Sequence, residues 1–107
     1  MNNNKQKELY AEVLETLIRH LQKRNDVQNI DLMNLSGFCR NCLSKWYRSA
    51  AEKRNINISN EEAKETIYGM PYSEWKKKYR TEATKEQLDK LKNNNKCTAP
   101  HTTAAEL

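Results

Sequence analysis

GFCRNCLSKWY, residues 37–47, is the stretch of this chain on which the fold depends most. It places two cysteines two residues apart and ends in a pair of aromatic residues. On a helical wheel, one face of the stretch and its continuation gathers both thiols and a tryptophan, in the set Cys39, Cys42, Leu43, Trp46 and Ala50. The spacing predicts one continuous helix over about residues 36–55, with both thiols and the indole of Trp46 pointing into the core.

The two segments before this stretch are predicted to differ in secondary structure. Apolar side chains recur at three- and four-residue spacing near the N-terminus, which predicts a long helix over about residues 5–24 with the stripe Tyr10, Val13, Leu14, Leu17 and Leu21. Residues 25–35 are instead expected to form a packed polar connection with a short turn capped by Asp31.

Three short helices are expected after residue 58. The first opens at a capping box formed by Ser59 and Glu62, and the third opens at a similar pair, Thr84 and Gln87. Pro71 suits the first turn of the helix between them. Two glycines and two prolines in the whole chain leave little of the turn chemistry that β-hairpins need.

The fold class expected from these segments is all-α. We expect a single domain over residues 1–93, an orthogonal array of about five helices, two long and three short, followed by a disordered tail over residues 94–107. Only 36% of the 107 residues are hydrophobic, so the core should be thin.

No run of this chain approaches the roughly 18 apolar residues that a membrane-spanning helix requires. The first residues, MNNNK, lack the apolar region of a secretory signal. We therefore expect a cytoplasmic protein with no membrane partner.

The net charge of +5 would favour an anionic partner such as nucleic acid. Two segments mix basic and aromatic residues, residues 46–48 and residues 75–80. In the second segment Trp75 and Tyr79 share one helical face, while the basic residues mostly point elsewhere. This arrangement favours a buried aromatic face with a solvated basic back, so nucleic-acid binding is the alternative and not the leading interpretation.

Cys39 and Cys42 allow three interpretations. Zinc is the candidate cofactor because thiolates two residues apart can reach one ion. Further ligands would have to come from His20 with a loop carboxylate, or from Cys97 and His101 near the C-terminus. The second interpretation is dithiol redox chemistry, since the pair lies near a predicted helix N-terminus. The third, packing of two small apolar side chains in the core, is favoured over both.

A concentration of polar residues around the predicted connection is a candidate polar site, consisting of Asp26, Asn29, Asp31 and Asn34, with His20 and Gln28 nearby. A histidine beside carboxylates could act as a general acid or base. Residues of these types in loops are more often caps and turn formers. The sequence holds no complete catalytic motif, so it does not identify an enzyme.

Residues 26–35 and 37–47, with YGMPY at 68–72 and EWK at 74–76, resemble a family of small bacterial proteins known as domain of unknown function 1244. The resemblance spans about residues 8–91. It implies a compact all-helical domain that forms a whole protein and self-associates, with no assigned activity. Residues from about 92 onward, including Cys97 and His101, lie outside the resemblance, which weakens a zinc site that uses them.

The leading interpretation is a helical protein that works by self-association or partner binding without catalysis. It rests on more aromatic side chains than one thin core can bury, of which four are expected in the core or at an interface, namely Trp46, Tyr47, Tyr72 and Trp75. The alternatives are a metal-binding or redox protein using Cys39 and Cys42, and a binder of nucleic acid or another anionic ligand.

Overall fold

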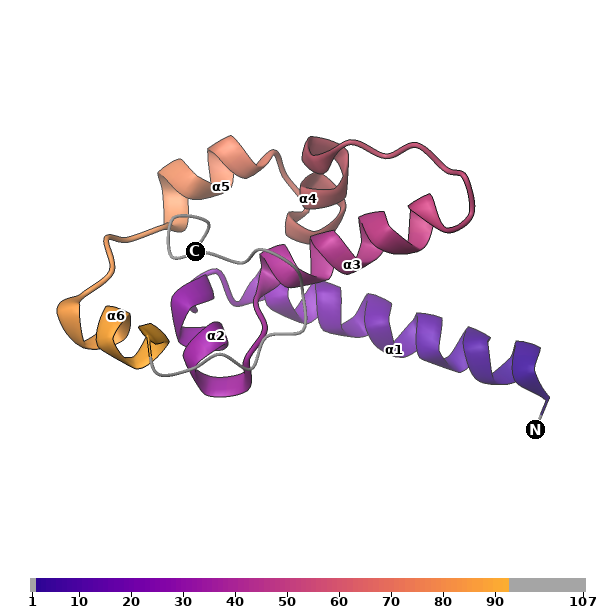
Figure 1. Ribbon diagram of the computed structural model, residues 1–107, viewed down its shortest axis with the longest axis horizontal. Coiled ribbons are helices and arrows are strands. Elements are labelled where there is room, and N and C mark those ends of the chain that lie inside the picture. The colour runs from indigo at the N-terminus through magenta and orange to yellow at the C-terminus, as the bar shows by residue number, and fades with distance from the viewer. Residues whose placement is uncertain (1, 93–107) are drawn as a thin grey trace.

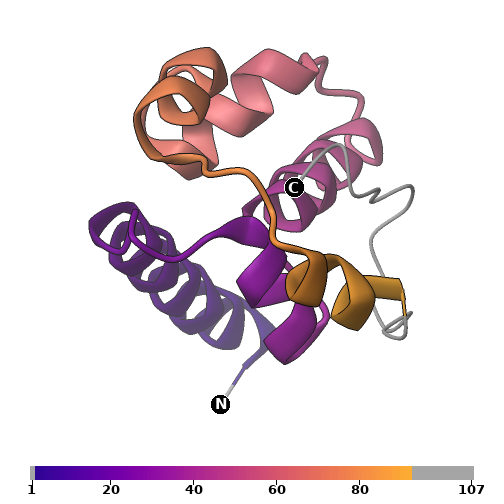
Figure 2. The same cartoon turned by 90° about the vertical axis from the view of Figure 1, so that its left-hand side faces the viewer.

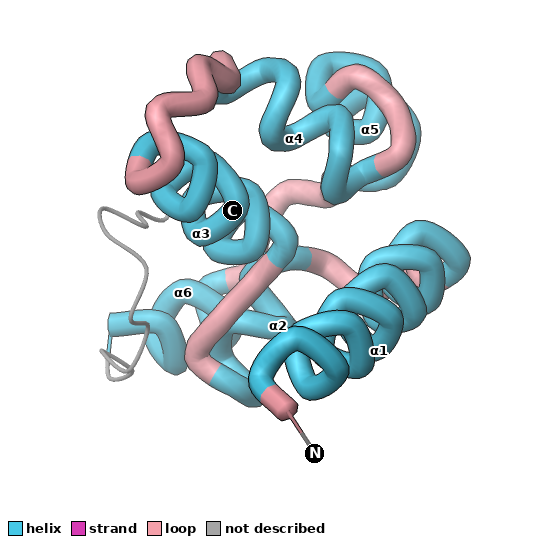
Figure 3. Tube along the Cα trace, turned by 90° about the vertical axis from the view of Figure 1, so that its right-hand side faces the viewer, coloured by secondary structure: helices cyan, strands magenta, loops and turns pink. Residues whose placement is uncertain are grey.

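The computed structural model describes residues 2–92, and within that range every regular element is a helix (Figures 1 and 3). The helices in chain order are α1 (Asn3–Lys23), α2 (Asn29–Ser36), α3 (Arg40–Glu52), α4 (Asn60–Tyr68), α5 (Tyr72–Tyr79) and α6 (Lys85–Lys92). The all-α prediction is confirmed, although the described range holds six helices where about five were expected. The predicted tail, residues 94–107, lies outside the described residues.

The additional helix is α2, which occupies the segment expected to be a polar connection. Gly37 ends it in the left-handed conformation, with φ of 78°, and the Gly37 N–H donates to the carbonyl of Met33 at 2.8 Å. A helix cannot run through such a cap, so the helix predicted over about residues 36–55 is confirmed in part only, and its predicted start is wrong. Instead, α3 begins at Arg40, and Cys39 is its N-cap residue.

The predicted N-cap residues Ser59 and Thr84 are confirmed, and the Thr84–Gln87 pair forms the complete capping box, with the Thr84 N–H donating to Gln87 Oε1 at 2.8 Å. The Glu62 N–H donates to the Ser59 hydroxyl at 3.1 Å at the start of α4, and the Gln87 N–H donates to the Thr84 hydroxyl at 3.1 Å at the start of α6. Pro71 lies one position before α5 and serves as its N-cap. Capping residues in the sequence therefore predicted where these three helices begin.

Buried side chains form two clusters. The first, called the main core here, joins α1, α3, α4 and α5 and consists of Leu21, Leu43, Ile67, Tyr68 and Trp75. The second, called the sulfur cluster, lies between α2 and the start of α3 and consists of Ile30, Met33, Cys39 and Cys42. Leu32 and Phe38 pack against both clusters and connect them.

The helices form no parallel bundle (Figure 1). α3 packs chiefly against α4, and α6 lies beside α2 at one end of the molecule (Figure 2). α1 joins the body near its C-terminal end and contacts α4, while its N-terminal turns extend beyond the other helices on the right of Figure 1.

Candidate functional site

The apolar stripe predicted on α1 is largely uncovered. Of its five side chains only Leu21 is buried, and the others are exposed by 64% (Tyr10), 68% (Val13), 44% (Leu14) and 36% (Leu17). These four side chains are called the α1 face below. The 3.6-residue periodicity identified the face correctly, but it does not tell how much of the face this chain's own core covers.

The early turns of α1 are uncovered because only its last turns pack against the rest of the molecule. Leu21 belongs to the main core and Ile18 packs against it, both in the last turns of the helix. The Gln22 side-chain amide donates to the Ile67 carbonyl at 3.1 Å, which also fixes this end to α4. No described helix covers the earlier turns, so a surface that is apolar by sequence stays accessible.

The two thiols lie together inside the molecule. Their sulfur atoms are 3.9 Å apart, and both residues have no exposed surface. The hydrogen bond with Cys42 raises the pKa of Cys39, and burial raises it further, so Cys39 keeps its proton well above neutral pH. In the closed fold the pair is protected from reaction in water, as the packing interpretation expects.

Trp46 does not point into the core with the thiols. It is 38% exposed, and its ring stacks on Phe38 with the ring centroids 6.5 Å apart. Tyr47 beside it is exposed to a similar degree. The expectation that one helical face buries both sulfurs and this indole is therefore wrong, because Cys39 precedes the helix and Trp46 lies a full turn beyond Cys42.

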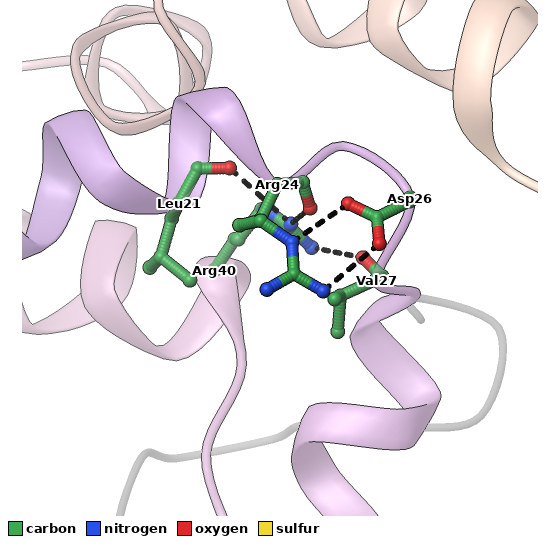
Figure 4. Close-up of polar contacts among 5 residues, drawn as sticks. All are labelled: Leu21, Arg24, Asp26, Val27 and Arg40. Atoms are coloured by element: carbon green, nitrogen blue, oxygen red, sulfur yellow. Dashed lines mark hydrogen bonds and ion pairs between the residues drawn. The ribbon is translucent and has the colours of Figure 1, made fainter.

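Arg40 is a buried residue whose role the sequence did not reveal. Its guanidinium donates to the carbonyl oxygens of Arg24 at 2.7 Å and Val27 at 2.8 Å (Figure 4). It also donates to Asn29 Oδ1 at 3.0 Å. Burial lowers the pKa of this group. These contacts fasten the C-terminal end of α1, where backbone carbonyls carry partial negative charge. In the sequence, the only indication of this role of Arg40 is its position between the two cysteines.

Asn29, predicted as part of a polar site, is a core residue. Its side-chain amide donates to the Tyr68 hydroxyl at 3.0 Å, and that hydroxyl donates to Asn41 Oδ1 at 2.6 Å. All three residues are buried, and burial raises the pKa of Tyr68. The chain of hydrogen bonds satisfies polar groups in the interior and offers no proton acceptor to solvent.

The other members of the predicted polar site lie apart. Asp26 forms an exposed ion pair with Arg24 at 3.0 Å, and the hydrogen bond from Arg24 lowers the pKa of its carboxyl. Asp31 accepts from the Gln87 amide at 2.9 Å, and the Asn34 amide donates to the Gln87 carbonyl at 3.0 Å. Asp31 and Asn34 therefore hold α6 against α2 and do not share a catalytic site with Asn29.

The zinc ligand set of Cys39, Cys42 and His20 is not assembled in the described range. His20 is exposed on α1, whereas the thiols are buried near the start of α3. Among residues 2–92, no three histidine, cysteine, aspartate or glutamate side chains are grouped so that they could hold a metal ion. Cys97 and His101, the alternative ligands, lie outside the described residues.

The aromatic residues of α5 belong to the interior. Trp75 has no exposed surface, its indole N–H donates to Asn25 Oδ1 at 3.0 Å, and its ring packs edge-on against Tyr68. Tyr72 is half-buried and packs against the main core. Trp75 is therefore not available for stacking on nucleic-acid bases, which removes its support for that alternative, whereas Trp46 and Tyr47 of the other basic and aromatic segment are exposed.

Comparison with known proteins identifies one family. The model of a family described as protein of unknown function (DUF1244) matches residues 27–93, which is more than half of the chain. The match includes both thiols and begins after α1, later than the resemblance from residue 8 suggested. A comparison with curated proteins finds no match. Within the described range, every helix is too short or too polar to cross a membrane.

Proposed function

Since this chain belongs to the DUF1244 family, whose description assigns no function, we propose that it acts by self-association through the α1 face. The observation that carries the proposal is the exposure of four apolar side chains on the turns of α1 that extend beyond the body. Exposed apolar surfaces of this kind are typical of protein interfaces. The proposal involves no catalysis.

Three observations support a second copy of the chain as the occupant of the α1 face. Residues 93–107 contain one large apolar side chain, Leu107, so this segment would cover the α1 face poorly. The opposite side of α1 carries three basic and three acidic residues, Lys7, Glu8, Glu12, Glu15, Arg19 and Lys23, so it lacks the net positive charge that favours an anionic membrane surface. Residues 3–17 contain two lysines and three glutamates, so two such segments can pair without the repulsion expected between chains of charge +5.

The expected association is weak. Each of the four side chains is about half exposed and would contribute roughly 1 kcal/mol on burial, or roughly 8 kcal/mol for two copies. Association costs at least about 4 kcal/mol. With the cost at this lower bound, the remaining free energy of about 4 kcal/mol corresponds to a dissociation constant of about 1 mM.

Sedimentation equilibrium at chain concentrations up to about 1 mM tests the proposal. The apparent mass of the wild-type chain should rise from 12.6 kDa toward twice that value. Val13→Lys should abolish the rise, because it places a charge in the centre of the α1 face. Thr16→Lys is the matched control, since it adds the same charge at an exposed position on another side of α1. A wild-type chain that stays monomeric at about 1 mM would rule out self-association.

We also propose a cytoplasmic location. The support is chemical: Cys39 and Cys42 are buried as thiols, and reducing compartments keep cysteine pairs in that state. Mass analysis of the protein isolated from cells with immediate alkylation under denaturing conditions tests this. A predominantly oxidised Cys39–Cys42 pair would contradict it.

A further inference from the structure

We propose that Cys39 and Cys42 form a reversible dithiol–disulfide site whose access to oxidants is controlled by α6. The site is separate from the α1 face, and its test does not depend on self-association. The proposal rests on where the backbone places the two sulfurs and on what covers them.

The N-cap position of Cys39 makes the pair competent to form a disulfide. Its backbone is extended, with φ of −147° and ψ of −177°, whereas Cys42 lies in the first turn of α3. The sulfur atoms are 3.9 Å apart and must approach to about 2.05 Å in a disulfide. Because Cys39 precedes the helix and follows the bend at Gly37, the approach can occur without breaking α3.

α6 is the element that covers the sulfur cluster from the C-terminal side. Leu91 of α6 and Ala83 just before it pack against the cluster. α6 itself contains no buried residue, and an open cavity of about 600 Å³ lies between it and α2. α6 lies beside α2 (Figure 2), and polar contacts of Gln87 with Asp31 and Asn34 hold it in place. An element fastened this weakly opens more readily than the main core.

The chemistry needs an oxidant, for which we propose a small peroxide. Once α6 opens, solvent can take the place of the Cys42 hydrogen bond and relieve the burial that together raise the pKa of Cys39, and the N-terminus of α3 favours a thiolate. One thiolate attacks a peroxide oxygen, the O–O bond breaks and a sulfenic acid forms, while the leaving hydroxide takes up the proton that this thiol lost and becomes the first water. The other sulfur then attacks the sulfenic sulfur, so that hydroxide leaves and takes up a proton as the second water. Two thiols and one hydrogen peroxide thus give one disulfide and two waters.

The sequence offers a direct assay. Trypsin cleaves after Arg24, Arg40 and Lys45, so the peptides 25–40 and 41–45 each carry one thiol and stay joined only when the disulfide has formed. The full chain with Cys97→Ala excludes pairing with the third cysteine. After treatment of the folded chain with hydrogen peroxide and alkylation of remaining thiols, mass spectrometry should show the joined peptides, and a reductant should separate them. Absence of joined peptides from the folded chain, when the urea-unfolded chain forms them, would overturn the proposal.

The role of α6 is tested by rate. Leu91→Ala should accelerate disulfide formation about tenfold, which corresponds to about 1.4 kcal/mol of opening free energy. Gln87→Ala should accelerate it in the same direction without altering the sulfur cluster. Ile56→Ala, an aliphatic truncation at an exposed position after α3, is the control and should leave the rate unchanged. Equal rates in all three variants would show that α6 does not control access.

Discussion

Replacement of Arg40 by methionine tests the main structural claim, that one buried guanidinium fastens α1 to the body. The change keeps the length of the side chain and removes three hydrogen bonds of 2.7 to 3.0 Å. Bonds from a charged donor contribute about 1.5 kcal/mol or more each, a loss of about 4.5 kcal/mol. Release of the buried charge from its desolvation penalty offsets part of this loss. We expect the free energy of unfolding to fall by about 3 kcal/mol.

Urea unfolding followed by tryptophan fluorescence measures this change, since the guanidinium carbon lies 5.1 Å from the centre of the Trp75 ring. The midpoint should move to lower urea with an unchanged slope. Arg24→Met is the matched control. It removes a guanidinium that forms only an exposed ion pair with Asp26, so the midpoint should hardly move. If both variants shift the midpoint equally, the clamp assigned to Arg40 is wrong.

Two further substitutions test burial and backbone conformation by the same unfolding measurement. Trp75→Ala should lower the free energy of unfolding by roughly 3–5 kcal/mol, whereas Trp46→Ala should lower it by less than about 1.5 kcal/mol, because only Trp75 is fully buried; similar losses would contradict the assignment of the main core. Gly69→Ala should cost about 1–2 kcal/mol, since φ is +74° and a Cβ would lie 2.9 Å from the Gln22 side chain; an unchanged midpoint would refute the strain.

Much of the fold could be predicted because it depends on local chemistry. The N-caps at Ser59 and Thr84 each involve two residues three apart, and no distant partner is needed to form them. α2 was missed although its C-cap was present in the sequence. Gly37 after a run containing Ile30 and Met33 is a stop signal for a helix, and interpreting it as one would have predicted α2 and moved the start of the next helix past Gly37.

What could not be predicted concerns how far neighbouring helices reach. Periodicity gives the direction of a side chain around its helix, but not whether another helix extends to that level. Leu21 is buried and Val13 is exposed on the same helix, because the body ends between them. Trp46 is partly exposed for a similar reason, because periodicity gave its direction around α3 but not what covers it. The polar site failed because Asn29 bonds to Tyr68, 39 positions away in the sequence, a contact that no local pattern encodes.

The two proposed sites meet at Arg40. This residue follows Cys39 directly in the chain, and its side chain holds the C-terminal end of the helix that carries the α1 face. Closing a disulfide requires the two sulfurs to approach from 3.9 Å to about 2.05 Å, and any accompanying movement of the Cys39 backbone reaches Arg40 across one peptide unit. The guanidinium has little freedom to absorb such a movement, because it is bonded to Arg24, Val27 and Asn29 at once. Oxidation of the sulfur cluster should therefore act on the anchoring of α1 before it acts on the main core, and that coupling should be lost when Arg40 is replaced by methionine.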